Sequence, residues 1–193
     1  MEMSGVMKKN VKWIIVAVLA VILCVYCIST YNHLARQEQE VDTAWANVEA
    51  QYQRRADLIP NLVATVQGYA KHEQETFTQV VDARAKALGT SDNIEEYAEA
   101  QQQVTAALGR LIAISENYPE LKADANFLEL QAQLEGTENR ITVARGEYNE
   151  QVKKFNTATV TFPSNLIAGM FGFEKKSLFT ASEGAAQAPQ VQF

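Results

Sequence analysis

Residues 13–28 read WIIVAVLAVILCVYCI and carry no charged side chain. No Lys, Arg, Asp or Glu stands anywhere between Lys12 and Arg36. A helix over residues 13–33 rises ~1.5 Å per residue, so it is long enough to cross a hydrocarbon core of ~30 Å. We therefore expect a transmembrane helix over residues 13–33, with the lipid bilayer as its partner.

A cleavable secretory signal is the alternative interpretation, with Lys8, Lys9 and Lys12 as its basic region. The apolar run is long for such a signal, and no pattern of small residues closes it. Neither Cys24 nor Cys27 follows the small residue that lipoprotein processing needs. The pattern therefore favours an uncleaved signal-anchor, in which both thiols are protonated, inert fillers.

Basic residues are unevenly distributed around this apolar run. Three lysines precede it in the basic segment 1–12, whereas Arg36 follows it and leads into the acidic Glu38 and Glu40. Short segments rich in Lys and Arg stay on the cytoplasmic side of a membrane. The sequence therefore predicts a cytoplasmic N-terminus and export of the residues from about 34 onward.

The composition of the chain excludes several function classes. Its 193 residues include 17 Lys and Arg against 23 Asp and Glu, which disfavours nucleic acid as a partner. Only two histidines and two cysteines are present, and the pair His72-Glu73 lacks the second histidine that a zinc site of this type needs. Phosphate-binding and nucleophile motifs are also missing from the sequence. We therefore expect a protein that is not an enzyme and has no metal or cofactor.

Residues 34–158 are rich in Ala, Gln, Glu and Leu, and apolar residues recur in them every three or four positions. This spacing predicts amphipathic helices, divided at Pro60, after Gly89 and at Pro119. Asp57 is the expected N-cap of a helix that begins near Pro60. The predicted fold is all-α: a transmembrane helix and then an antiparallel bundle of four helices, or of three if Pro60 only kinks a long helix. Coiled-coil heptad spacing is shown by Leu134, Ile141, Tyr148 and Phe155.

The character of the chain changes after residue 158. Residues 159–180 are apolar but too short to span a bilayer, and Pro163, Gly169 and Gly172 interrupt them. We expect an apolar extended segment that contacts its own bundle, a neighbouring subunit or the membrane surface. Residues 181–193 are predicted to be a disordered tail. The candidate oligomer or membrane contacts are Phe162, Pro163, Leu166, Ile167, Met170, Phe171, Phe173 and Phe179.

Residues 41–73 read VDTAWANVEAQYQRRADLIPNLVATVQGYAKHE. They resemble the signature of the LemA family of bacterial membrane proteins, through two motifs: Arg54-Arg55-x-Asp57-Leu58-Ile59-Pro60-Asn61-Leu62 and Gly68-Tyr69-x-x-His72-Glu73. The resemblance implies an N-terminally anchored helical bundle without an established enzymatic activity. With the cytoplasmic N-terminus that the lysines predict, we expect the anchor in the inner (cytoplasmic) membrane and the bundle on its periplasmic side. It also implies, by family association alone, membrane proteases or TPM-domain proteins as partners.

The favoured hypothesis is a non-enzymatic scaffold of the bacterial cell envelope that binds membrane partners and forms homo-oligomers. Envelope assembly or protein quality control is the process that the resemblance suggests. The alternative is a ligand-binding protein or enzyme with a polar pocket near Arg54, Arg55, Asp57 and His72. The candidate interaction or structural residues are Arg54, Arg55, Asp57, Pro60, Asn61, Tyr69, His72 and Glu73.

Overall fold

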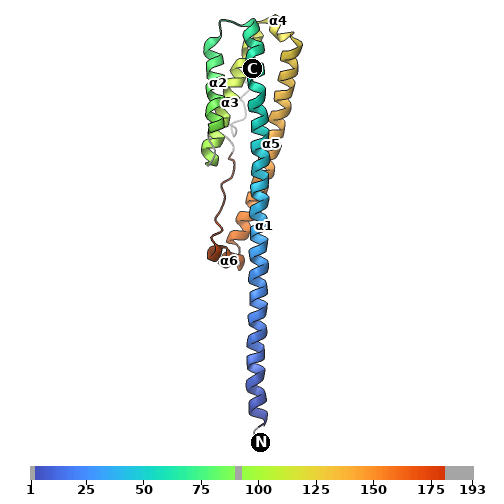
Figure 1. Cartoon of the computed structure of the whole chain (residues 1–193), viewed down its shortest axis with the longest axis vertical. Coiled ribbons are helices and arrows are strands. Elements are labelled where there is room, and N and C mark those ends of the chain that lie inside the picture. The colour runs from blue at the N-terminus through green and yellow to red at the C-terminus, as the bar shows by residue number, and fades with distance from the viewer. Residues whose placement is uncertain (1–2, 90–92, 181–193) are drawn as a thin grey trace, which may run out of the picture. The chain divides into compact units, whose positions relative to one another are not determined.

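A computed structural model describes residues 3–89 and 93–180, so the predicted disordered tail lies outside the described residues. Within these ranges every regular element is a helix, which confirms the all-α prediction (Figure 1). The elements are α1 (Met3–Tyr69), α2 (Gln74–Gly89), α3 (Ile94–Ile114), the 3-10 turn η1 (Ser115–Asn117), α4 (Pro119–Lys122), α5 (Ala125–Val160) and α6 (Ser164–Phe171).

The described chain divides into two compact units. The anchor unit comprises residues 3–42 and 151–176. The bundle unit comprises residues 43–89, 93–150 and 177–180. Helices α1 and α5 contribute residues to both units, and each unit has apolar contacts of its own.

The bundle unit consists of four long helical stretches within the described residues, from α1, α2, α3 and α5. In this unit α1 and α3 run in one direction and α2 and α5 in the other (Figure 1). The apolar positions spaced three and four apart face inward, and each buried large side chain contributes about 1.5–3 kcal/mol before entropy is subtracted. Their interior includes Ile59, Leu62, Val66, Phe77, Val80, Val104, Leu108, Leu111, Phe127 and Leu134.

Pro60 lies inside α1, so the expected helix start at Asp57 is wrong. Because proline has no N–H, the carbonyl of Ala56 loses its usual partner in the helix. Arg84 of α2 replaces that partner by donating its Nε–H to the Ala56 oxygen at 2.7 Å. Asp57 is exposed and accepts a hydrogen bond from Gln53 Nε2 at 2.8 Å, so it caps nothing. A hydrogen bond from the neighbouring helix therefore allows α1 to continue through its proline.

The turn between α1 and α2 falls at residues 70–73, ten residues later than expected. The N–H of Glu73 donates to the carbonyl of Ala70 at 3.2 Å and closes this turn. The predicted end of the next helix at Gly89 is confirmed, and Asn93 then caps α3 by accepting from the N–H of Glu95 at 2.9 Å. Glycine and N-cap residues in the sequence thus predict the end of α2 at Gly89 and the start of α3 correctly, but they do not predict where α1 ends.

The sequence predicted that the last helix of the bundle begins at Pro119, and this prediction is wrong. Pro119 begins only the four-residue α4. Asp124 starts α5 instead, because its Oδ1 accepts the N–H of Phe127 at 2.9 Å. This hydrogen bond is the main reason that the pKa of the Asp124 carboxyl is lowered, and the hydroxyl of Tyr69 adds to it.

The anchor unit contains the apolar stretch of α1, the end of α5 and α6. From Val11 onward, α1 is the one described helix that is long and apolar enough to cross a membrane. Part of the segment expected to be extended is helical, because Ser164–Phe171 form α6. This helix ends at Gly172, whose φ of 77° is left-handed and suits glycine. A small apolar cluster joins α6 to α1 through Leu34, Ile167 and Ala168, with Cys27, Ala158 and Phe173 packed against it.

Candidate functional site

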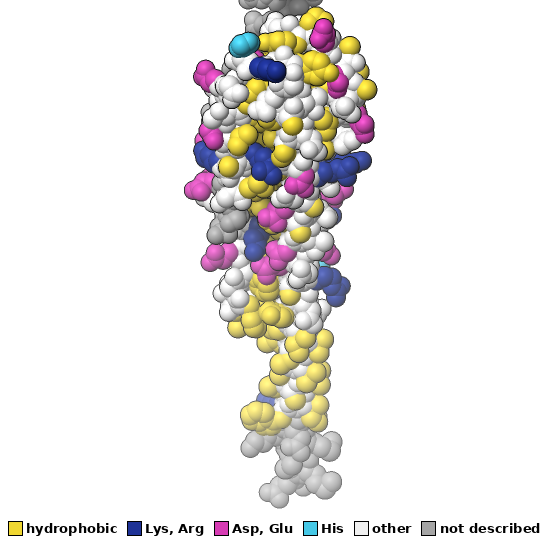
Figure 2. Space-filling model, turned by 45° about the horizontal axis from the view of Figure 1, so that its top comes forward, with side chains coloured by type: hydrophobic (Ala, Val, Ile, Leu, Met, Phe, Trp, Pro, Cys, Tyr) yellow, Lys and Arg dark blue, Asp and Glu magenta, His cyan; other side chains and the backbone are white. Residues whose placement is uncertain are grey.

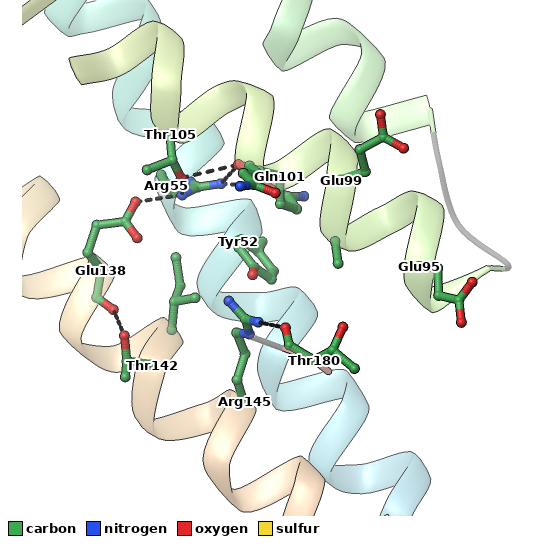
Figure 3. Close-up of a pocket in the computed structure, with 13 residues that line it drawn as sticks. Tyr52, Arg55, Glu95, Glu99, Gln101, Thr105, Glu138, Thr142, Arg145 and Thr180 are labelled. Carbon is green, nitrogen blue, oxygen red and sulfur yellow. Dashed lines mark hydrogen bonds and ion pairs between the residues drawn. The ribbon is translucent and has the colours of Figure 1, made fainter. Parts of the chain in front are cut away.

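A pocket of about 480 Å³ lies in the bundle unit between α1, α3 and α5 (Figure 3). Its size falls within the ~300–1,000 Å³ that small-molecule sites occupy. The lining is polar and carries charges of both signs. Helix α1 contributes Tyr52 and Arg55, α3 contributes Glu99, Gln101 and Thr105, and α5 contributes Glu138, Thr142 and Arg145.

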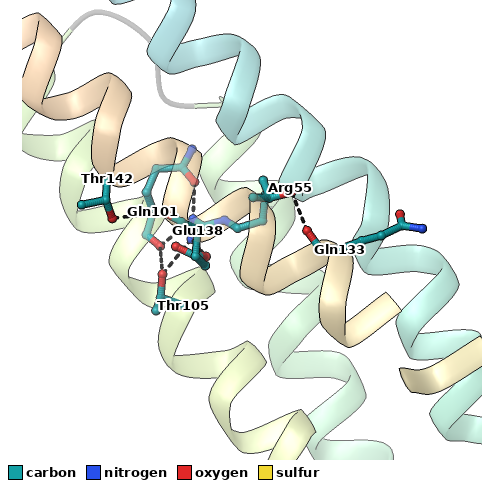
Figure 4. Close-up of polar contacts among 7 residues, drawn as sticks. Arg55, Gln101, Thr105, Gln133, Glu138 and Thr142 are labelled. Carbon is teal, nitrogen blue, oxygen red and sulfur yellow. Dashed lines mark hydrogen bonds and ion pairs between the residues drawn. The ribbon is translucent and has the colours of Figure 1, made fainter. Parts of the chain in front are cut away.

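Arg55 is the centre of a buried hydrogen-bond network in this pocket (Figure 4). Its Nη1 donates to Thr105 Oγ1 at 2.8 Å and to the carboxylate of Glu138. Its Nη2 donates to the carbonyl of Gln101 at 3.0 Å and to Gln101 Oε1 at 2.7 Å. The guanidinium carbon also lies 5.0 Å from the ring centre of Tyr52. Since Arg55 is only 1% exposed, these contacts replace the water that a buried charge loses.

The second arginine of the pocket, Arg145, is also engaged within the bundle unit. Its guanidinium carbon lies 4.8 Å from the ring centre of Phe179, and its Nη2 donates to the carbonyl of Thr180 at 3.3 Å. Burial raises the pKa of the Tyr52 hydroxyl, and the charges of Arg145 and Arg55 offset part of that increase. The Tyr52 phenol is therefore neutral at pH 7 and is not an activated base or nucleophile.

The final described residues of the bundle unit, 177–180, form a short strap on α5. The side chain of Asn149 holds it through both of its polar atoms: Nδ2 donates to the carbonyl of Phe179 at 2.9 Å, and Oδ1 accepts the N–H of Phe179 at 2.8 Å. The ring of Phe179 lies 5.4 Å from that of Tyr148 and 5.7 Å from that of Trp45. Phe179, a candidate contact for a neighbour or the membrane, is therefore buried in its own chain.

Among the candidate motif residues, Arg55 alone lines the pocket. The structure does not bring Arg54, Asp57 and His72 to it, since all three are exposed elsewhere on the bundle unit. Pro60 and Asn61 are likewise exposed on α1, and Glu73 is half-buried in the turn after it. Tyr69 ends α1 and donates its hydroxyl to Asp124 Oδ2 at 2.9 Å, which ties α1 to the start of α5.

Sequence reasoning missed the partners of Arg55, although part of the signal was present. Arg55 lies on the same helix face as the buried Tyr52 and Ile59, whereas Arg54 does not. A charge on an apolar face needs a partner, and Glu138 stands on α5 among apolar heptad positions. The helix register alone therefore distinguishes Arg55 from Arg54.

Arg55 pairs with Glu138 in this pocket, and the phenol of Tyr52 is neutral. Glu99 and Arg145 also line the pocket, so it keeps charges of both signs. Among the residues that the structure describes, no group of three or more His, Cys, Asp or Glu is placed to hold a metal ion. The hydrogen bonds of Arg55 thus join three helices beside a polar pocket.

Comparison with known proteins gives a consistent set of relatives. The model of the LemA family matches residues 44–193. The protein LemA of Metamycoplasma hominis is 26% identical over 152 residues, which cover 79% of this chain and 69% of that protein. The magnetosome protein MamQ of Magnetospirillum gryphiswaldense is 25% identical over 174 residues, which cover 77% of this chain and 64% of that protein. The magnetosome protein MamQ 1 of Paramagnetospirillum magneticum matches with the same identity and coverage.

Proposed function

Because the chain belongs to the LemA family and carries an apolar helix long enough to cross a bilayer, we propose that it is a membrane-anchored scaffold without enzymatic activity. The observation that carries this proposal is the network around Arg55, whose terminal nitrogens donate to Thr105, Gln101 and Glu138. A site that binds or converts a ligand needs polar groups that are free to meet it. Here the most buried charge of the pocket is engaged in holding three helices together.

The proposed location is the inner (cytoplasmic) membrane, with residues 13–33 as a single span. The N-terminus is cytoplasmic and the bundle unit is periplasmic, because Lys8, Lys9 and Lys12 precede the span and Arg36 alone follows closely. Protease added to spheroplasts should then digest the bundle unit of the full chain. Digestion in inverted vesicles alone contradicts this orientation.

Self-association is the second part of the proposal. A groove of about 360 Å³ on the bundle unit lies between α1 and α5, and Asn47, Gln51 and Val143 line it. Val143 is 61% exposed, and the side-chain oxygen of Gln51 is buried without a hydrogen-bond partner among the described residues. A second copy that docks on this groove would remove the exposed side chain of Val143 from water. Anchors held parallel in one membrane also raise the effective concentration of the bundles.

A photo-crosslinking residue at Val143 of the full chain, in native membranes, tests this contact. The matched control carries the same residue at Val81, which is 50% exposed on α2. Crosslinked multiples of the 21.4 kDa chain are expected from Val143 and not from Val81. Monomers from both positions, together with a monomer mass after gentle solubilisation, contradict the proposal.

The proposed partners are other membrane proteins of the envelope, with a membrane protease or TPM-domain protein as the first candidates by family association. The alternative function, a ligand-binding protein, is favoured by the size of the pocket beside Arg55. Thr142→Trp fills that pocket from α5 and distinguishes the two functions. A scaffold keeps the proteins that co-purify with the full chain after this change. Loss of those proteins, in a variant that melts at the wild-type temperature, supports the ligand-binding alternative.

A further inference from the structure

Helix α6 in the anchor unit is apolar on both of its faces. Ile167 and Ala168 are buried against Leu34 of α1. On the outward side, Leu166 is 58% exposed and Met170 is 76% exposed. No charged residue stands between Lys154 and Glu174, and Asn165, near the start of α6, is the one exposed polar side chain of this helix. The large apolar side chains of Leu166 and Met170 therefore form an exposed patch that an apolar phase should cover.

The contacts of α6 place it at one particular level of α1. Its cluster includes Cys27 and Leu34 of α1, and the ring of Phe171 lies 4.8 Å from that of Tyr31. Counted from Trp13 at ~1.5 Å per residue, Tyr31 is ~27 Å along the helix. The hydrocarbon core of a bilayer is ~30 Å thick. Helix α6 therefore packs on α1 where a span that starts at Trp13 leaves the hydrocarbon.

The charged residues begin just beyond this level. Lys176 Nζ pairs with Glu38 Oε1 at 2.8 Å, seven residues after Tyr31 on α1. Two turns of helix thus separate the aromatic contact from this ion pair. An aromatic belt followed by basic residues is the pattern found where a protein surface passes from acyl chains to lipid headgroups.

We propose that α6, with Phe162 before it, is an interfacial membrane helix that inserts Leu166, Met170 and Phe162 among the acyl chains of the bilayer that α1 crosses. This inference rests on the proposed membrane anchor. Lipid is the occupant because α6 packs on α1 beside Cys27 and Tyr31, at the end of the exposed apolar stretch of α1, which Figure 2 shows as a band of hydrophobic side chains. Phe162, which precedes α6 in the chain, is 75% exposed as well. The chain then has two membrane contacts, and the second fixes the depth and rotation of α1 at its exit.

The test is a nitroxide label at Met170 of the full chain in lipid nanodiscs, with Cys24→Ala and Cys27→Ala as background. Identical labels at Val21, in the apolar stretch of α1, and at Val81, on α2, give the lipid and water references. We expect the Met170 label to collide several-fold more often with oxygen than with a water-soluble nickel chelate, as at Val21. The Val81 label should show the opposite ratio. A label at Leu166 should repeat the Met170 result, and helical circular dichroism checks that each variant is folded.

Each other outcome overturns the inference in a distinguishable way. A Val21 label in lipid with Met170 and Leu166 labels in water removes α6 from the membrane and leaves the anchor intact. A Val21 label in water removes the anchor and the inference together. Spin–spin broadening at Met170 that disappears on dilution with unlabelled chain, without the lipid pattern, assigns the face to a second copy.

Discussion

The surroundings of Arg55 in the bundle unit and of α6 in the anchor unit pose opposite physical problems. Around Arg55 a charge lies where water is excluded, and Thr105, Gln101 and Glu138 meet it with hydrogen bonds. On the outward face of α6, Leu166 and Met170 lie where water has access, at 58% and 76% exposure. The first region is complete within the chain, whereas the second needs something from outside it.

This difference indicates where to look for function in a helical protein without catalytic motifs. A polar pocket is a usual candidate for a ligand site. Its polar groups indicate a ligand only where they lack hydrogen-bond partners within the protein. An exposed apolar surface of several large side chains is not removed from water by its own chain, and it indicates a contact with another molecule or a membrane. The outward face of α6 is therefore a stronger pointer to function than the pocket.

The largest effect is expected from Arg55→Met, which keeps the apolar stem but removes the guanidinium. It leaves Gln101 and Glu138 without their partner and should lower the free energy of unfolding by about 3 kcal/mol. Arg54→Met, at an exposed neighbour, and Met170→Gln, on α6, should each change it by less than about 0.5 kcal/mol. Denaturant unfolding of the full chain in detergent, followed by circular dichroism, measures all three. An equal loss from Arg55→Met and Met170→Gln contradicts a stabilising role that is particular to the Arg55 network.

Alkaline pH tests the burial of Tyr97, next to the Arg55 network. Burial is the first cause that raises the pKa of its phenol from 10.0 to about 12. Its contribution to stability is therefore full below pH ~10 and is lost as the pH rises toward ~12, because the unfolded chain ionises first. The loss over that window should be up to about 2–3 kcal/mol. Thermal unfolding at pH 9 and pH 11 should differ less in Tyr97→Phe than in the wild type, and equal pH dependence contradicts the prediction.

A smaller effect is expected where Arg84 meets the carbonyl of Ala56. Arg84→Met leaves that buried carbonyl without a donor and should destabilise the bundle unit by about 1–2 kcal/mol. Pro60→Ala restores the N–H that the helix lacks, so Arg84→Met should have less effect in that background. A double-mutant cycle of unfolding free energies measures the coupling. Additive effects show that Arg84 acts independently of Pro60.

The smallest effect is expected at Asp57, which looks like a helix cap in the sequence. Its only described hydrogen bond is the exposed one from Gln53, so Asp57→Ala should change the free energy of unfolding by less than about 0.5 kcal/mol. A loss of about 1 kcal/mol in the same unfolding experiment is typical of a removed N-cap and contradicts a continuous α1.

The sequence predicted what depends on composition and short-range periodicity. The apolar run, the helical fold, the helix end at Gly89 and the apolar character of residues 159–180 belong to this class. The helical conformation at Pro60 and the burial partners of Arg55 could not be predicted in the same way. Both depend on residues far away in the sequence: Arg84 bonds to the carbonyl that Pro60 leaves free, and Glu138 pairs with Arg55. Propensity could not show that a proline stays within a helix when another helix supplies its hydrogen bond. The helix register along α1 carries a signal that Arg55 is buried, but it does not identify the partners of Arg55 on α3 and α5.

The most direct test compares both regions in one preparation of native membranes. A photo-crosslinking residue is placed at Met170, on α6, or at Thr142, in the pocket, and the adducts of the full chain are identified by mass spectrometry. We expect lipid adducts from Met170 and no small-molecule adduct from Thr142. A defined ligand on Thr142 together with no lipid on Met170 contradicts it.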